Sequence, residues 1–315
     1  MTEPPAIDIA GAERRLRGHI LETPLIEWSQ ARIWLKCENQ QLTGSFKLRG
    51  ALNKVLGLST EALARGLVAA SAGNHGIGLA LAATVARTSA TVVVPQNVVE
   101  RKRRTLEALG AEVRLAAGDF AVAEREGYAL AAERGAVWVS PYNDAEVIAG
   151  QGTLGLELGR QLRACRLQDE IEVYVPVSGG GLLAGVGLGL RLAEAPVRLI
   201  GVQTENAPYF HRYLRGEDPA LVVELPTLAD GLAGAVEAGS ITWELVRQLA
   251  DDVLVVSEAE IRLALLRVHR QTGMLIEPSA AVAVAACLVG RGRHRIAILS
   301  GGNVDPNLLQ RLAQV

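Results

Sequence analysis

The sequence has few cysteines and few aromatic residues. Only Cys37, Cys165 and Cys287 occur among 315 residues, and no two of them form a CxxC pair. An odd number of cysteines at wide spacing argues against both a disulfide framework and a structural zinc site. Aromatic residues make up 4% of the chain against 49% hydrophobic residues. The core must therefore consist of Leu, Val, Ala and Ile, a composition typical of parallel sheets covered by helices.

The chain also lacks a charge excess and a long apolar run. Its 32 basic and 34 acidic residues leave a net charge of -2, so we expect no nucleic-acid or membrane partner and instead a small-molecule ligand. The most apolar segment, residues 274–290, is interrupted by Glu277 and Pro278, which indicates a buried helix rather than a membrane span. The first twenty residues contain several charges and no signal-peptide core, which predicts a cytoplasmic protein.

Short β-branched runs alternate with longer segments of helical period from Leu67 onward. This alternation predicts an α/β fold with parallel strands and crossover helices. The predicted strands cover residues 33–37, 67–71, 90–94, 112–115, 136–139, 171–177, 198–202, 253–256 and 295–299. The predicted helices include residues 46–56, 98–109, 120–133, 146–162 and 258–271. No Gly, Ser or Pro linker separates two halves, so a second domain is expected to be inserted into the first.

Open parallel sheets bind ligands at the carboxyl ends of their strands, which directs attention to four loops. The first contains SFKLRGA, residues 45–51, where we expect Ser45 to cap a helix with Lys47 in its first turn. The helix dipole disfavours a cation at that end, so the lysine is better explained if its amine is neutral or bonded to an aldehyde. The alternative is that Lys47 and Arg49 are solvated helix charges.

The second loop, SAGNHG, places Ser71, Asn74 and His75 between a strand and a helix start. Backbone amides at a helix start bind anions, and the hydroxyl, amide and imidazole groups beside them could orient a carboxylate. The same letters also form a good capping sequence with a structural histidine. Function and capping both remain open for this loop.

The third loop, VSGGGLLAG at residues 177–185, has three consecutive glycines after a predicted strand. Such a turn can wrap its backbone around a phosphate at the positive end of the next helix. A rival interpretation is a dinucleotide fingerprint, because Gly179, Gly181 and Ala184 satisfy GxGxxA and Glu205 ends the next strand. The rival does not account for Lys47 or for the second loop.

The fourth loop, LSGGNVD at residues 299–305, again joins a strand to a small polar residue and paired glycines. Its alternative interpretation is an ordinary tight turn capped by Asn303 or Asp305.

Taken together and in this order, the four loops resemble the tryptophan synthase β family of pyridoxal-phosphate enzymes, or fold type II. The similarity is strongest to its threonine/serine dehydratase and serine racemase branch. Further matching segments are TPL, VIAGQGT, TLADGLA, DDVLVVSEAEI and EPSAA. The resemblance implies a pyridoxal 5'-phosphate-dependent ammonia-lyase (dehydratase) that converts L-threonine, L-serine or a related β-hydroxy-α-amino acid to a 2-oxo acid and ammonia by α,β-elimination. The alternatives on this scaffold are an amino-acid racemase and a β-replacement synthase.

The resemblance also implies roles for individual residues. Lys47 would hold the cofactor as a Schiff base and act as the base for the Cα proton. Phe46 would stack near the pyridine ring, Asn74 would bond the ring hydroxyl, and Ser300 would face the pyridine nitrogen. The expected phosphate-binding residues are Ser178, Gly179, Gly180, Gly181 and Leu182. The expected substrate-binding residues are Ser71, Ala72, Asn74 and His75.

Departures from the family pattern narrow these expectations. Ala72 stands where racemases of this branch have a second serine, so racemization is expected to be weak or absent. Gln203 and Tyr209 stand where many relatives have a glutamate and an aspartate that hold a divalent cation, so no metal is expected, with Glu205 as the one conceivable substitute. The resemblance further implies a homodimer of two-domain chains. A large domain at residues 1–65 and 144–315 and a small mobile domain at residues 66–143 would bind the cofactor in the cleft between them.

Overall fold

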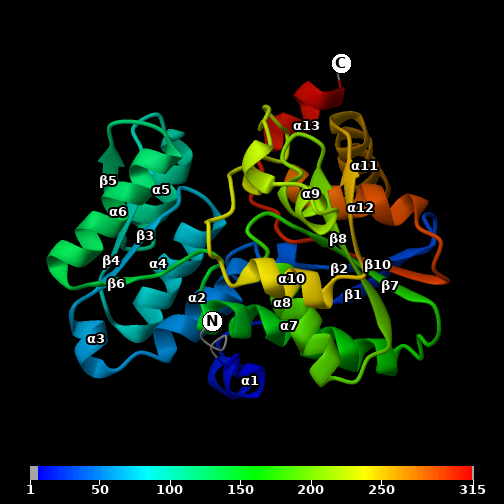
Figure 1. Ribbon diagram of the computed structural model, residues 1–315, viewed down its shortest axis with the longest axis horizontal. Coiled ribbons are helices and arrows are strands. Elements are labelled where there is room, and N and C mark those ends of the chain that lie inside the picture. Colours follow the sequence, from blue (N-terminus) through cyan, green and yellow to red (C-terminus); the bar gives the residue numbers. More distant parts are fainter. Residues whose placement is uncertain (1–5, 314–315) are drawn as a thin grey trace. The chain divides into compact units, whose positions relative to one another are not determined.

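The computed structural model describes residues 6–313, and the chain divides into two compact units. One unit comprises Leu21–Phe46 and the chain from Gln151 onward, and the other comprises Lys47–Gly150 with the segment that precedes Leu21. Each unit contains a sheet flanked by helices (Figure 1), which confirms the predicted α/β class. The sequence predicts an inserted domain at residues 66–143, whereas the second unit already begins at Lys47 and includes α1 (Ile9–Leu16).

The first unit contains a six-stranded sheet in the order β1-β2-β10-β7-β8-β9. Its strands are β1 (Leu25–Trp28), β2 (Ile33–Lys36), β7 (Ile171–Pro176), β8 (Val197–Thr204), β9 (Asp252–Val256) and β10 (His294–Ile298). The β1–β2 pair is antiparallel, and the other four pairs are parallel. Because parallel strands end at the same edge, the loops after β2, β10, β7 and β8 are neighbours along the carboxyl edge of this sheet.

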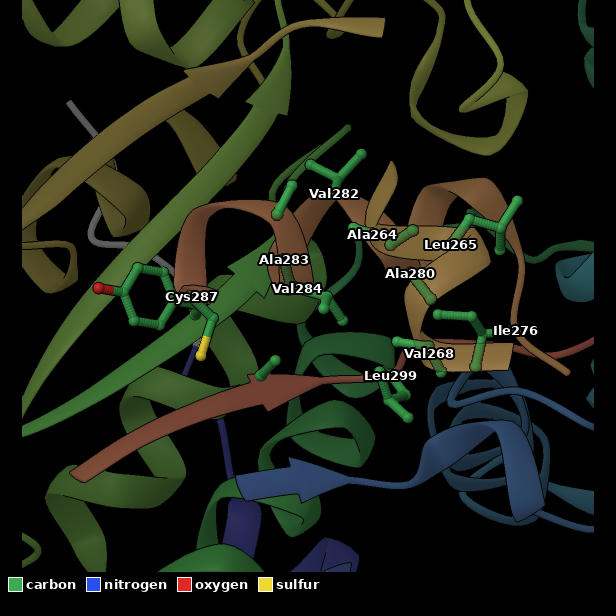
Figure 2. Close-up of a cluster of buried hydrophobic side chains, with 14 of the residues drawn as sticks. Ala264, Leu265, Val268, Ile276, Ala280, Val282, Ala283, Val284, Cys287 and Leu299 are labelled. Atoms are coloured by element: carbon green, nitrogen blue, oxygen red, sulfur yellow. The ribbon is translucent and has the colours of Figure 1, made fainter. Parts of the chain in front are cut away.

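Helices cover both faces of this sheet, with α12 (Pro278–Val289) on one side and α8 (Gly181–Leu192) on the other (Figure 1). The remaining helices of the unit are α7 (Ala145–Ala164), which spans the boundary between the units, α9 (Tyr209–Leu214), α10 (Thr242–Leu249), α11 (Glu258–Thr272) and α13 (Pro306–Ala313). Figure 2 shows Val284 and Cys287 of α12 within the core, and Ala280 beside Val268 and Leu265 of α11. The predicted buried helix at residues 274–290 is present but begins only at Pro278, which suits the first position of a helix.

The second unit contains a four-stranded parallel sheet in the order β5-β4-β3-β6. Its elements after α1 are α2 (Lys47–Leu56), α3 (Thr60–Ala64), β3 (Leu67–Ala70), α4 (Asn74–Ala86), β4 (Ala90–Pro95), α5 (Glu100–Ala108), β5 (Glu112–Ala116), α6 (Phe120–Arg134) and β6 (Val137–Trp138). Successive residues of β4 point to opposite faces: Val92 packs with Ala80 of α4, whereas Val93 packs with Ala123 of α6. Helices therefore cover both faces of this sheet as well.

All nine predicted strands are present, as are the helices predicted at residues 46–56, 98–109, 120–133, 146–162 and 258–271, and each of these ends agrees within two residues. The strand β1 was not predicted. Within the described residues, no helix combines the length and apolar character that crossing a bilayer requires.

Candidate active site

Lys47 is the first residue of α2, and its amine lies inside the second unit. Its Nζ donates a hydrogen bond to the carbonyl of Pro141 at 2.8 Å. Burial lowers the pKa of Lys47 from 10.5 to about 8, so a far larger fraction of the amine is neutral at physiological pH than for an exposed lysine. Arg49, one half-turn further on, is fully buried. The alternative that Lys47 and Arg49 are solvated helix charges is therefore wrong.

The prediction that Ser45 caps α2 is also wrong. Ser45 is fully buried and its Oγ has no hydrogen-bond partner. The reason is that α2 begins two residues later, at Lys47, and Ser45 instead forms a β-bridge with Gly301. The next residue continues this pairing, because the Phe46 N–H donates to the carbonyl of Ser300 at 3.1 Å. The residue before Lys47 is thus fastened to the loop that follows β10.

The second predicted loop begins α4 in the same unit as Lys47. The Oγ of Ser71 accepts a hydrogen bond from the N–H of Gly73 at 3.2 Å, and α4 then begins at Asn74 without a side-chain cap. A Cβ on Gly76 would lie 2.2 Å from the carbonyl oxygen of Ser71. Only glycine therefore lets the helix start pack against the end of β3. The capping interpretation of this loop is wrong, because the Ser71 hydroxyl closes a turn before the helix and caps none of its amides. The first turn of α4 therefore still presents backbone amides.

His75 in the first turn of α4 is held as a neutral imidazole. Its Nε2 lies 2.8 Å from the carbonyl oxygen of Val139, and because a carbonyl can only accept, Nε2 must carry the proton. Burial, together with the charge of Lys47, lowers the pKa of His75 to about 3, despite the opposing effect of the Val139 hydrogen bond. Its Nδ1 is therefore an acceptor at physiological pH.

The glycine turn of the first unit has the geometry of an anion site. Gly180 adopts φ +85° as the N-cap of α8, which has no side-chain cap. A Cβ on Gly180 would lie 2.8 Å from the ring of Phe210, so both its conformation and its surroundings require glycine. The first amides of α8, from Gly181 onward, have no acceptor within the helix and lie at its positive end. Such a helix start favours a phosphate.

Ser300 follows β10, which lies between β2 and β7 in the sheet. Ser300 is buried. Because the loop that contains Phe46 follows β2 and the glycine turn follows β7, Ser300 lies between these two loops along the edge of the sheet. The alternative interpretation of the fourth loop, a turn capped by Asp305, is confirmed. The carboxylate of Asp305 accepts from the N–H of Asn307 at 3.0 Å. Asn303 lies three residues before the start of α13, and its side-chain amide donates to the carbonyl of Thr43 at 2.8 Å.

A buried ion pair that supports this part of the first unit was not predicted. The amine of Lys36, fully buried at the end of β2, contacts the carboxylate of Glu157 on α7 and donates to the carbonyl of Thr23 at 2.6 Å. The hydroxyl of Thr23 in turn donates to Glu38 at 2.5 Å. The available signal was a lysine at the end of an otherwise apolar strand. Nothing in the sequence indicated the carbonyl groups that bond Lys47 and His75, because every residue type has a backbone carbonyl.

Three side chains were considered as possible ligands of a divalent cation, and each of them makes hydrogen bonds within the protein: Gln203, Tyr209 and Glu205. Gln203 contacts two backbone groups, and the hydroxyl of Tyr209 donates to Glu224 at 3.1 Å. Glu205 accepts from the N–H of Glu258 at 3.2 Å, at the start of α11. Among residues 6–313, no group of three or more His, Cys, Asp or Glu side chains is placed to hold a metal ion.

Three comparisons with known proteins agree with one another. A family model described as pyridoxal-phosphate dependent enzyme matches residues 16–300. The chain is 41% identical over 314 residues to the L-threonine ammonia-lyase of Thermotoga maritima, covering 97% of this chain and 77% of that protein. Threonine deaminase isoform 2 from Solanum lycopersicum, in its processed form, matches with a TM-score of 0.88 at 31% identity, over 97% of this chain and 86% of that one. Serine racemase from Dictyostelium discoideum matches with a TM-score of 0.85 at 33% identity, over 95% and 98% of the two chains.

Proposed function

Because this chain belongs to the pyridoxal-phosphate dependent enzyme family, we propose that it is an ammonia-lyase that converts L-threonine, L-serine or a related β-hydroxy-α-amino acid to a 2-oxo acid and ammonia. The observation that carries the proposal is the buried amine of Lys47, whose pKa is lowered to about 8 at the start of α2. The similarity to the threonine ammonia-lyase of Thermotoga maritima supports the choice of substrate and reaction.

The residues present fit the cofactor. The turn at Gly180 leaves no room for a side chain and begins a helix without a side-chain cap, as an ester phosphate requires. We assign the phosphate to the turn from Ser178 to Leu182. Phe46 would lie near the ring, Asn74 would bond the ring hydroxyl, and Ser300 would face the ring nitrogen.

Bound pyridoxal phosphate supplies the electron sink that weakens the bond between Cα and its hydrogen. Lys47 would have two tasks: its Nζ would hold the cofactor, and the same atom would accept the Cα proton of the substrate. Both tasks need a neutral amine, and burial raises the neutral fraction near neutral pH by lowering the pKa of Lys47 to about 8. Ser300 would offer the ring nitrogen a neutral hydroxyl rather than a carboxylate. A neutral hydroxyl at that position would favour loss of the β-hydroxyl over transamination, because it would not hold a proton on the ring nitrogen.

The substrate carboxylate is assigned to the loop from Ser71 to His75. Because the Nε2 proton of His75 is engaged by Val139 and its Nδ1 is an acceptor, the imidazole has no N–H to offer a carboxylate. We therefore assign this contact to the hydroxyl of Ser71 and to the backbone amides at the start of α4, including that of His75.

The alternatives on this scaffold receive less support. The fold similarity to a serine racemase keeps racemization in view, but Ala72 provides no hydroxyl for the opposite face of Cα. We propose that racemization is weak or absent. The loop at Asn74 and His75 also differs from the threonine-rich substrate loop of β-replacement synthases. The dinucleotide interpretation does not account for the family match. We also propose that the enzyme is a cytoplasmic homodimer.

The test is turnover by the purified protein loaded with pyridoxal phosphate. L-Threonine should yield 2-oxobutanoate and ammonia, and L-serine should yield pyruvate. Lys47→Ala should abolish turnover and the visible absorbance band that borohydride removes. A Lys47→Ala protein with that band and full activity would refute the proposal, and chiral chromatography of unreacted serine would reveal a racemase.

A further inference from the structure

One buried side chain, Gln203, joins the entry of the glycine turn to helix α9. Gln203 is 1% exposed and lies near the carboxyl end of β8. Its Nε2 donates to the carbonyl of Val177 at 3.4 Å, and its Oε1 accepts from the N–H of His211 at 2.9 Å. Both polar atoms of the carboxamide therefore connect separate backbone segments.

Gln203 satisfies two backbone groups that regular secondary structure leaves open. The N–H of Val177 continues the β7–β8 ladder by donating to Val202 at 2.9 Å, but its carbonyl lies beyond the end of β7 and precedes Ser178. His211 is the third residue of α9, whose N-cap has no side-chain hydrogen bond. First-turn amides have no acceptor within their own helix. The carboxamide therefore supplies the missing donor and the missing acceptor.

Helix α9 in turn packs directly against the glycine turn. The ring of Phe210 is fully buried and lies 2.8 Å from where a Cβ on Gly180 would stand. The imidazole of His211 fastens α9 to β9, because its Nδ1 lies 2.7 Å from the carbonyl oxygen of Val253. A displacement of α9 would therefore move the glycine turn in two ways: through the contact of Phe210 with Gly180, and through the hydrogen bond of Gln203 to Val177.

The same helix is linked to a second loop through Tyr209. The hydroxyl of Tyr209 donates to Glu224 at 3.1 Å, and the same carboxylate oxygen accepts from the N–H of Gly234 at 2.7 Å. These hydrogen bonds hold the segment around Gly234 against the start of α9. Helix α9 thus connects two loops of the first unit.

The chemistry at position 203 depends on an amide. A carboxylate there would bring an acceptor against the carbonyl of Val177, and only a proton or a cation could join the two oxygens. The carboxamide supplies an N–H instead. Its oxygen is already engaged by His211, and the Tyr209 hydroxyl donates to Glu224, so this donor set does not fit a hard divalent cation.

We propose that Gln203 is a positioning residue that holds the phosphate-binding turn through its carboxamide and makes cofactor binding independent of divalent cations. The inference rests on the proposed function, because the turn is assigned there to the ester phosphate. The hydrogen bond to Val177 fixes the backbone at the entry of the turn, and the hydrogen bond to His211 fixes the helix on which Gly180 rests.

The experiment measures the dissociation constant of pyridoxal phosphate by titration of the apoenzyme, with the phosphorus NMR signal of the bound ester as a second readout. For the natural chain, excess EDTA, magnesium and calcium should each leave the constant unchanged. Gln203→Leu and the isosteric Gln203→Glu should each raise it about tenfold and shift the phosphorus signal. Calcium should restore affinity to Gln203→Glu, where a cation can join the two oxygens, but not to Gln203→Leu.

Gln161→Leu is the matched control, because the carboxamide of Gln161 also both accepts and donates hydrogen bonds in the same unit. Its Oε1 accepts from Lys36 at 2.9 Å, and its Nε2 donates to the carbonyl of Thr23 at 2.8 Å and to Glu22 at 3.5 Å. This variant should lose stability without losing cofactor affinity. Natural-like affinity in Gln203→Leu, or cofactor binding by the natural chain that EDTA abolishes, would overturn the inference. Failure of the natural chain to bind pyridoxal phosphate at all would instead refute the proposed function.

Discussion

At the scale of single residues, Lys47 shows how a reactive group costs stability. Its amine is buried at the positive end of a helix, and both conditions disfavour the ammonium form. The same conditions keep the amine available as a nucleophile and base. The surrounding fold therefore has to tolerate a group that would be more stable in water.

This reasoning predicts that Lys47→Met stabilises the apoenzyme. The folded pKa of about 8 lies below the unfolded value of 10.5, so between these pH values the unfolded chain binds the extra proton and the stability of the natural protein rises with pH. At pH 7 the variant should be more stable by on the order of 1–3 kcal/mol. The gain should shrink as the pH rises from 8 to 10.5. Urea unfolding of both proteins at each pH measures the difference, and a gain that grows with pH would contradict it.

At the residue scale, the sequence proposes roles for distinctive side chains, but it cannot propose roles for backbone atoms. Lys47, Asn74 and His75 were identified from their loops, and the structure brings Lys47 and His75 close enough for the charge of one to affect the other. The carbonyls of Val139 and Pro141 that hold these side chains could not be predicted, because any residue type supplies a carbonyl. The tautomer of His75 depends on the carbonyl of Val139, so the sequence could not predict it either.

At the scale of elements, the strands and helices with a clear period were predicted with accurate ends. The strand β1 was not predicted because it is a four-residue strand at the edge of the sheet and contains the exposed Glu27. Such a segment shows neither a buried apolar run nor a clean alternation. The predicted cap at Ser45 was wrong for a different reason. Ser45 pairs with Gly301, which is distant in sequence, and this pairing delays the start of α2 until Lys47.

The glycine turn permits a matched test of its geometry. Gly180→Ala should lower the affinity for pyridoxal phosphate at least about tenfold, because the left-handed φ of +85° is strained and the new Cβ would meet Phe210 at 2.8 Å. Gly216→Ala is the control, since Gly216 has φ +77° but nothing within 4 Å of the added Cβ. Both variants should lose stability in thermal unfolding. Equal cofactor affinity in the two would show that the turn does not bind the phosphate.

The buried pair of Lys36 and Glu157 joins β2 to α7 and should behave as a unit. Glu157→Gln keeps an acceptor for the N–H of Thr23 but removes the carboxylate charge that contacts the buried ammonium of Lys36. We expect a loss of about 3–5 kcal/mol in the free energy of unfolding. The double variant Lys36→Met with Glu157→Leu should recover much of that loss, because both charges of the pair are then removed together. Urea unfolding of the single and double variants tests this, and additive losses would contradict it.

At the scale of the whole molecule, the order of four loops along the chain identified the family better than any one loop. Each loop separately had an alternative interpretation, and one of these, the helix cap at Asp305, also holds in the structure. The boundaries of the two units were less accessible, because the second unit includes α1 and α2, which no composition change sets apart.

The composition of the whole chain makes the central claim easy to test. The sequence contains only four lysines, Lys36, Lys47, Lys54 and Lys102. Lys36 pairs with Glu157 and Lys54 with Asp144. Lys102 lies on α5. A single attachment site for the cofactor can therefore be distinguished from the others by peptide mapping.

The most direct measurement is borohydride reduction of the protein loaded with pyridoxal phosphate, followed by mass spectrometry of its peptides. The account predicts one phosphopyridoxyl group per chain, attached to Lys47, and none on the other three lysines. A label on Lys36, Lys54 or Lys102 alone, or no label after loading, would contradict it.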